Sequence, residues 1–335
     1  MVDIVSGLIL FDGEKVTPVS RRCEECWNMI RSAVGRRSDM VHSRRHFLKT
    51  GLAATSLAAA AGPLLAAPTK RSATDLVTLG NSGVKVSRLA FGTGTMSGRV
   101  QRELGQDQFN RLVRHAYDNG VRFFETAESY TGMPEMLGIA LKGIPRDSYM
   151  LMTKYTTKGP EEAQVKIDRF RKQMNTDYFD ILLLHCVRSP SWTEELKRLQ
   201  DDFSEAKEKK IILSKGASVH GLPALRAFPG YRWLDIAMIR MNHQGSHMDT
   251  PDTRDVKMPG NVEEVVGHVR KVKAQGTGVI SMKLVGEGEF TNPEDRQAAL
   301  NFAFSVAGVD AVTIGYKNTA EIDEAIKRVN NALSA

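Results

Sequence analysis

Cysteine is scarce in this sequence, which has three among its 335 residues. Cys23 and Cys26 form one Cys-Glu-Glu-Cys pair and Cys186 stands alone, so there is no framework of paired cysteines for disulfides. One such pair is at best half of a structural zinc site, and no second pair follows. We therefore expect neither a disulfide scaffold nor a metal site.

Long apolar runs and basic clusters are also missing. The most apolar stretch, residues 52–67, contains Gly62 and Pro63 and is short for a membrane span, so we expect no stable membrane insertion. No run of Lys and Arg and no basic-aromatic stripe follows residue 67, and this argues against nucleic-acid binding. A content of 41% hydrophobic and 25% charged residues excludes a disordered or fibrous chain and supports one large core.

The sequence does contain a regular alternation of short apolar runs with segments of helical period. Eight strands are predicted at residues 89–96, 121–126, 149–153, 178–184, 211–218, 234–241, 278–284 and 311–315. Helices are predicted at residues 108–119, 161–175, 193–209, 262–274, 295–306 and 320–331. Strict alternation in a chain of this length predicts a single parallel (β/α)8 TIM barrel over residues 75–335. Residues 76–79 and 84–88 predict an N-terminal β-hairpin before it.

A doubly wound open sheet is the competing architecture. That fold usually has a glycine-rich turn directly after its first strand. Here residues 92–98, Gly-Thr-Gly-Thr-Met-Ser-Gly, resemble such a turn only loosely. In a barrel the same glycines would let the backbone approach a ligand at the mouth, so the barrel remains the predicted fold.

Four polar side chains follow the ends of three successive predicted strands: Glu125, Tyr130, Lys154 and His185. In a parallel barrel these positions open into the mouth where catalysis takes place. A phenol protonates a carbonyl efficiently only if its pKa falls from about 10 towards neutrality. Lys154, held by Glu125, is expected to supply this by favouring the phenolate. His185 is expected to orient a carbonyl, which makes this group a candidate catalytic centre.

The motifs that carry these residues resemble the aldo-keto reductases. They are Phe-Glu-Thr-Ala-Glu-Ser-Tyr at 124–130, Thr-Lys at 153–154 and Leu-Leu-His at 183–185. The resemblance implies hydride transfer between a nicotinamide nucleotide and a small carbonyl, alcohol or sugar-like substrate, with Tyr130 as proton donor. One position departs, because Glu125 replaces the family's Asp. The extra methylene moves the carboxylate by roughly 1 Å, and a displacement of that size can cost about 100-fold in rate.

The resemblance also implies residues for the nicotinamide end of the cofactor. Ser218 occupies the place of a serine that holds the carboxamide, while Met238 and Met241 replace a Gln and a stacking Tyr. Methionine packs against flat rings but is a poor hydrogen-bonding partner for an amide. Lys283 follows the seventh strand, where such barrels commonly bind phosphate. Met238 and Met241 can equally be core residues, and Lys283 a buried lysine with a carboxylate partner.

At the adenine end the resemblance involves residues 314–325. Gly315 and Glu324 match the family pattern, whereas Ala325 replaces an Asn. Glu321 stands where the family has a Gln or Arg near the ribose 2′ position, with Lys317 beside it. A carboxylate repels a phosphate and accepts hydrogen bonds from a ribose hydroxyl. The cofactor is therefore NAD or NADP with NAD favoured, unless Lys317 and Glu321 are simply solvated surface residues.

The N-terminal region resembles a twin-arginine export signal. Residues 43–49, Ser-Arg-Arg-His-Phe-Leu-Lys, precede the mildly apolar stretch 52–67, which ends in small residues. We expect a signal peptide at 43–67, the twin-arginine export machinery as a partner and a periplasmic location. Residues 1–42 are an extension that is either not translated or disordered, with Met40 as the expected initiator. Together with His185-Cys186 and Arg240-Met241-Asn242-His243, the signal resembles an exported bacterial branch of the family.

Alternative functions and sites remain open at this point. The weakened carboxamide and adenine positions also suit a non-catalytic periplasmic barrel that binds a ligand. Scarcity of free nucleotide outside the cytoplasm suits an isomerase-like enzyme with tightly bound nucleotide. His220, His243 and His247 offer an alternative metal site, but residues 242–259 are typical of a loop rather than of a helix that would align two histidines.

Overall fold

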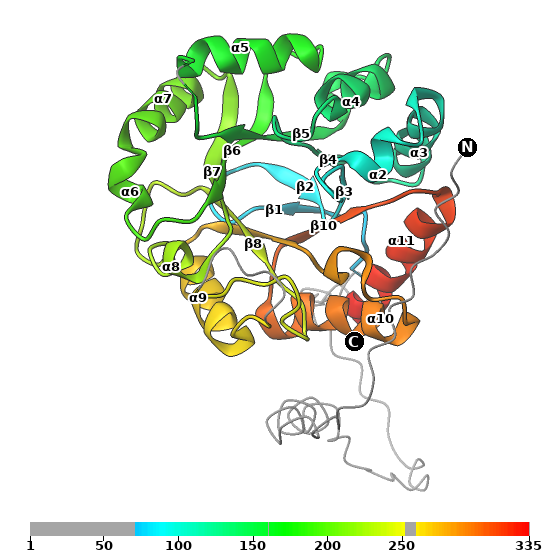
Figure 1. The fold of residues 1–335 in the computed structure, drawn as a ribbon. Coiled ribbons are helices and arrows are strands. Elements are labelled where there is room, and N and C mark those ends of the chain that lie inside the picture. Colours follow the sequence, from blue (N-terminus) through cyan, green and yellow to red (C-terminus); the bar gives the residue numbers. More distant parts are fainter. Residues whose placement is uncertain (1–70, 160, 252–258, 335) are drawn as a thin grey trace, which may run out of the picture. The chain divides into compact units, whose positions relative to one another are not determined.

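Eight parallel strands close into a barrel in the computed structural model, which describes residues 71–159, 161–251 and 259–334 (Figure 1). The strands are β3 (Leu89–Gly92), β4 (Phe123–Glu125), β5 (Met150–Thr156), β6 (Phe179–Val187), β7 (Ile212–Val219), β8 (Ile236–Arg240), β9 (Gly278–Met282) and β10 (Ala311–Gly315). Each strand pairs with its neighbours in the sequence, and β10 closes the barrel between β9 and β3. The predicted TIM barrel is confirmed.

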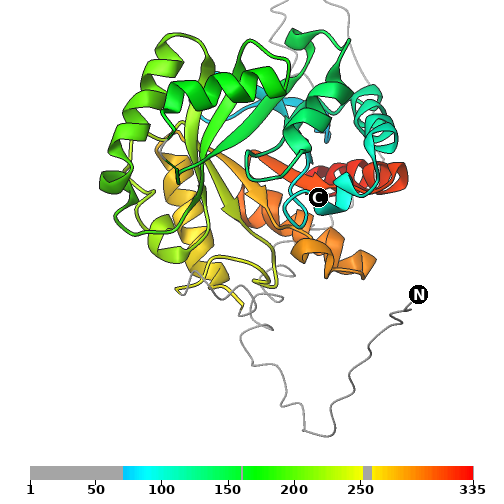
Figure 2. The same cartoon turned by 45° about the horizontal axis from the view of Figure 1, so that its top comes forward.

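Helices surround the strands on the outside (Figures 1 and 2). They are α2 (Arg99–Arg102), α3 (Gln106–Asp118), α4 (Met133–Leu141), α5 (Ala163–Gln173), α6 (Trp192–Glu195), α7 (Lys197–Glu208), α8 (Leu222–Leu225), α9 (Val262–Ala274), α10 (Pro293–Asn301) and α11 (Thr319–Ser334). Among the described residues, no helix has the length and apolar character needed to cross a membrane. The signal predicted at 43–67 and the extension before it lie outside the described residues.

Two apolar layers follow from the alternation of side chains along each strand. One set of strand residues, such as Phe91 and Phe124, packs outward against the helices. The other set, such as Phe123 and Ile181, fills the inside of the barrel. Because both faces are buried, the strands are almost continuously apolar in sequence.

The predicted N-terminal hairpin is present as β1 (Leu76–Thr78) and β2 (Lys85–Ser87), which pair antiparallel. Leu79, at its turn, is fully buried with the inner residues of the barrel. A Cβ on Gly278, the first residue of β9, would lie 2.6 Å from the Leu79 side chain. The hairpin therefore covers the N-terminal end of the barrel, and the mouth lies at the opposite end.

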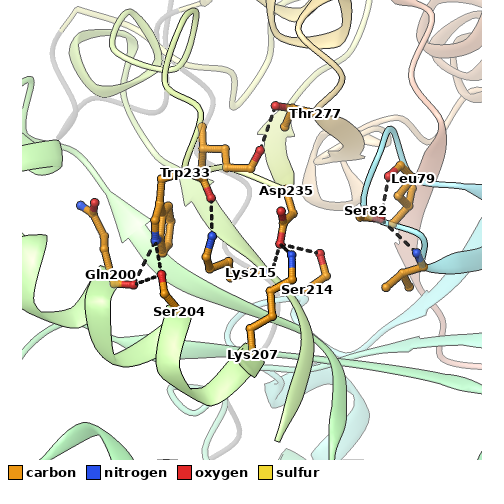
Figure 3. A network of polar contacts seen from close by, with 12 residues as sticks. Leu79, Ser82, Gln200, Ser204, Lys207, Ser214, Lys215, Trp233, Asp235 and Thr277 are labelled. Carbon is orange, nitrogen blue, oxygen red and sulfur yellow. Dashed lines mark hydrogen bonds and ion pairs between the residues drawn. The ribbon is translucent and has the colours of Figure 1, made fainter. Parts of the chain in front are cut away.

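Polar contacts tie elements together at this covered end (Figure 3). Asp235 binds Lys207 of α7 at 2.6 Å and accepts the backbone N–H of Lys215 at 3.0 Å. The Lys215 amine donates to the Trp233 carbonyl at 3.0 Å, and the Trp233 indole donates to Ser204 at 3.2 Å. Polar residues at this end of such barrels stabilise the fold rather than act in catalysis.

Some predicted element boundaries were wrong. The helix predicted at 193–209 is broken at Leu196 into α6 and α7. The helix predicted at 295–306 starts at Pro293 and continues beyond Asn301 as a π-helix over Phe302–Ala307. Helix α4 was not predicted, because Gly132 and Pro134 look like loop residues. In the structure Gly132 precedes the helix in a left-handed conformation and Pro134 lies in its first turn, where proline is tolerated.

Candidate active site

Lys154 of β5 lies at the centre of the predicted catalytic group and is fully buried. Its ammonium forms an ion pair with Glu125, the last residue of β4, and donates to the Thr126 carbonyl at 2.9 Å. The third contact is to the Tyr130 hydroxyl oxygen at 3.3 Å. An ammonium has three donors and no acceptor, so all three are in use. The phenol oxygen must accept from Lys154, which leaves the phenol proton available to another acceptor.

Glu125 also connects Lys154 of β5 to β10, the last strand of the barrel. Its second carboxylate oxygen accepts a hydrogen bond from the Thr313 hydroxyl of β10 at 3.2 Å. The longer side chain of Glu, compared with Asp, thus reaches both the lysine on β5 and the threonine on β10. Thr313 is a partner that sequence patterns did not reveal.

The pKa of Tyr130 lies well above its ordinary value, because burial disfavours the phenolate and Glu125 adds to the effect. This is opposite to the lowering expected from the sequence. The physical reason is that Glu125 neutralises Lys154 at contact distance, so little of the ammonium's charge acts on the phenol. Tyr130 is therefore a protonated phenol in this structure.

His185, two residues before the end of β6, lies against Tyr130 with ring centroids 5.6 Å apart in an edge-to-face arrangement. Its Nδ1 is 3.1 Å from the hydroxyl of Ser129, a second partner not predicted from sequence. Burial and the positive charge of Lys154 hold the pKa of His185 well below its ordinary value. The ring is neutral, and the contact at Nδ1 leaves Nε2 for a ligand. The structure thus brings all four predicted catalytic residues together.

A cavity of about 530 Å³ opens beside this group. Its walls include Glu125, Tyr130 and His220 at the barrel mouth and continue along the loops after β9 and β10 to the start of α11. Gly94 also lines it, and a Cβ at this position would lie 2.7 Å from the Tyr130 hydroxyl. The glycine expected to make room for a ligand therefore also makes room for the catalytic phenol.

The structure places some of the residues predicted for the nicotinamide end on the cavity wall and others in the interior. Met238 lines the cavity. Met241 is fully buried in the layer between strands and helices, and Ser218 is fully buried with its Oγ 3.3 Å from the backbone N–H of Cys186. Neither Ser218 nor Met241 is among the cavity-lining residues. Met241 lies one residue beyond the end of β8.

Lys283 lines the cavity directly after β9 and forms an ion pair with Glu287. Its backbone is left-handed, with φ of 63°, which is uncommon for a residue with a side chain. Burial and the neighbouring Arg240 lower the pKa of Lys283 to about 8. A cation in this position suits an anionic ligand such as a pyrophosphate. The negative charge of such a ligand would favour the charged ammonium form of Lys283.

At the far end of the cavity, Gly315, Lys317, Glu321 and Glu324 all line the wall. A Cβ on Gly315 would lie 2.4 Å from the Thr95 hydroxyl, so a larger residue there would require the Thr95 side chain to move.

Glu321 is held by its own helix terminus, because its carboxylate accepts the backbone N–H of Lys317 at 2.9 Å. Its backbone N–H in turn donates to Asn318 at 3.0 Å, an arrangement that caps α11. Glu324 pairs with Arg296 and Arg328, two cations on the same wall that sequence reasoning missed.

The histidines considered as a metal group do not come together. His243 lies 3.7 Å from Asp295, while His247 lies 2.8 Å from Glu289. His220 lies instead beside His185, with ring centroids 6.2 Å apart.

The arrangement as a whole fits a nicotinamide nucleotide. A proton-bearing phenol lines one end of the cavity, with the neutral imidazole of His185 beside it although not on the wall, and a lysine and a capped helix start lie along its length. The weak point of the fit is the carboxamide, since Ser218 does not line the wall and Met238 stands in the place of the Gln expected from the resemblance.

Comparison with known proteins identifies the family of this chain. A model of the aldo/keto reductase family matches residues 88–297. L-galactose dehydrogenase of Arabidopsis thaliana is 25% identical over 302 residues, covering 76% of this chain and 88% of that protein.

Solved structures share the fold. An aldo-keto reductase from Pseudomonas aeruginosa superposes with a TM-score of 0.63 at 19% identity, covering 78% of this chain and 98% of that one. One from Klebsiella pneumoniae in complex with NADPH has a TM-score of 0.57 at 16% identity, covering 76% and 88%. The family match spans more than half of the sequence and includes Glu125, Tyr130, Lys154 and His185. This chain belongs to the aldo/keto reductase family of oxidoreductases.

Proposed function

We propose that this protein interconverts a small carbonyl compound and its alcohol with a nicotinamide nucleotide, and that Tyr130 transfers the proton. The observation that carries the proposal is the contact between Lys154 and the Tyr130 oxygen at 3.3 Å. Because Lys154 only donates, the phenol proton is directed away from it and towards the cavity that Tyr130 lines.

A nicotinamide nucleotide, when bound, supplies or accepts the hydride. In the reducing direction Tyr130 gives its proton to the carbonyl oxygen, and His185 donates from Nε2 to the same oxygen to orient it. The phenolate oxygen that remains accepts the hydrogen bond from Lys154, until a proton from water restores the phenol. Met238, Lys283, Gly315, Lys317, Glu321 and Glu324 are among the described wall residues that would contact the nucleotide.

The test is oxidation of NADPH or NADH by the purified protein with a panel of aldehydes, ketones and sugars. We expect oxidation that depends on the added carbonyl and saturates with its concentration. Binding of neither nucleotide, measured by calorimetry, would instead favour a ligand-binding barrel without redox chemistry.

Glu321 is proposed to favour NADH over NADPH. A carboxylate about 4 Å from a 2′-phosphate costs about 4 kcal/mol at an effective dielectric near 20. Glu321 is 34% exposed, and Lys317, Arg296 and Arg328 lie on the same wall, so most of this penalty is screened. We expect a preference for NADH of about threefold, or ~0.6 kcal/mol.

Calorimetric titration of the nucleotide-free protein with both nucleotides measures this preference. The variant Glu321→Gln should bind NADPH more tightly, while Asp323→Asn, a change on the same helix outside the cavity wall, should not. If the unaltered protein binds NADPH at least as tightly as NADH, Glu321 does not determine which nucleotide is bound.

We also propose export through the twin-arginine pathway to the periplasm, on the strength of the sequence at 43–67. Replacing Arg44 and Arg45 with Lys should leave the protein in the cytoplasm of a bacterial host, as measured by cell fractionation. Deleting residues 1–39 should leave export unchanged. Normal recovery of the double-Lys protein from the periplasm would contradict the signal assignment.

A further inference from the structure

Three side chains with metal-binding atoms meet at the barrel mouth. The ligand atoms of His185, Cys186 and His220 all lie within 4.8 Å of one another. His185 and Cys186 are adjacent near the end of β6, and His220 directly follows β7. Two imidazoles and one thiol at this separation have the composition of a three-coordinate transition-metal site.

A local irregularity of the backbone creates this cluster. Neighbouring residues of a strand normally point to opposite faces, so His185 and Cys186 should diverge. The register between β6 and β7 shifts between Leu184 and Val187, which marks a β-bulge. Within it Cys186 is left-handed, with φ of 57°. Such a conformation costs about 1–3 kcal/mol in a residue with a side chain, and strain of this kind gathers at functional sites.

All three groups are available as ligands. The contact of His185 Nδ1 with Ser129 at 3.1 Å fixes the ring and leaves Nε2, as is usual for histidines that bind metals. Within the described part of the chain, neither the Cys186 thiol nor the His220 imidazole makes a hydrogen bond. His220 lines the cavity and Cys186 is half-buried, so an ion can reach the cluster.

The ligand set selects among metals. Zinc(II) usually takes four ligands in a tetrahedron, whereas two histidines and one cysteine in a trigonal arrangement are typical of copper sites. The nearby cations Lys154, Lys283 and Arg240 are each paired with a carboxylate, so their charges do not decide the metal. Copper(I) is monovalent and is selected by soft thiolate ligands, while imidazole also suits copper.

We propose that His185, Cys186 and His220 bind one copper(I) ion in a three-coordinate site at the barrel mouth. Binding forms a bond between copper and the Cys186 sulfur, and the thiol proton is released to solvent. No electron transfer is required.

Copper binding has a consequence that rests on the proposed function. The ion would occupy His185 Nε2, the atom proposed to donate to the substrate carbonyl. Copper(I) and substrate would then exclude each other, and the metal would inhibit carbonyl reduction.

Anaerobic titration of the full chain with copper(I), in competition with a chromophoric copper(I) chelator, tests the site. Cys23→Ser and Cys26→Ser should be present in every sample, because a pair of cysteines also binds copper(I). We expect one copper ion per chain. Loss of second-shell partners typically costs 10–100-fold in metal affinity, so loss of a ligand in Cys186→Ser or His220→Gln should cost at least about 100-fold.

His243→Gln is the matched control, since His243 also lies near the mouth but outside the cluster. It should bind copper as tightly as the background protein. Circular dichroism of each variant checks that it is folded, and the two ligand variants provide independent tests of the site.

Absence of binding in the background protein, or unchanged affinity in a folded ligand variant, would overturn the proposal. Tighter binding of zinc(II) than of copper(I) would overturn the choice of metal. The titration uses no nucleotide and no carbonyl substrate, so its outcome is independent of whether the protein is a reductase.

Discussion

Replacing Tyr130 with Phe should lower the rate of carbonyl reduction at least about 100-fold, the usual scale of general acid catalysis. The change removes the phenol proton, which is directed towards the cavity because Lys154 donates to the phenol oxygen. It also removes one of the three acceptors of the buried Lys154 ammonium, which retains Glu125 and the Thr126 carbonyl. Steady-state kinetics with either nucleotide would measure the loss.

The matched control is Tyr149→Phe, the same chemical change before the start of β5, at the covered end of the barrel. It should leave turnover within about twofold, because Tyr149 is remote from the mouth in a fold whose chemistry takes place there. If Tyr130→Phe retained the turnover of the unaltered protein while remaining folded, Tyr130 would have no part in proton transfer.

Glu125→Gln is expected to destabilise the protein by about 3–5 kcal/mol, the usual result of leaving a buried charge without its partner. Lys154 is fully buried, and Glu125 is its only ion-pair partner among the described residues. Urea unfolding followed by circular dichroism would give the free energy of unfolding. The variant Glu125→Asp keeps the charge, so it should keep most of the stability.

Two further variants test whether the loss of stability depends on the burial of the ion pair or follows from the loss of any carboxylate. Glu161→Gln removes an ion pair with Arg169 at the surface and should cost less than about 1 kcal/mol. Combining Glu125→Leu with Lys154→Met removes both buried charges and should recover much of the stability lost in Glu125→Gln. Equal effects of Glu125→Gln and Glu161→Gln would contradict the view that Lys154 depends on Glu125.

The barrel could be predicted because a parallel sheet with two buried faces leaves short apolar runs that are easy to locate. Strand β10, for example, has the predicted bounds, as does helix α9. Helix α4 was missed because its start contains Gly132 and Pro134, and their effect depends on position rather than on identity. The break at Leu196 also has no strong local signal.

The site was predicted at the level of residue types and strand ends, but not of its electrostatics. Sequence places Lys154 near Tyr130 yet cannot show that Glu125 contacts the lysine closely enough to cancel its charge. Nor can period-two alternation reveal that a bulge turns His185 and Cys186 to the same side. Partners brought from distant segments, such as Thr313 and Ser129, became visible only in the folded chain.

The closing position of β10 has a consequence for biosynthesis. This strand pairs with β9, which precedes it, and with β3, which is synthesised more than 200 residues earlier. Until β10 has emerged, the nascent chain leaves both β3 and β9 with an unpaired edge, and exposed edges of that kind invite association with other chains. Premature termination within the last βα unit should thus yield insoluble protein rather than a smaller working barrel.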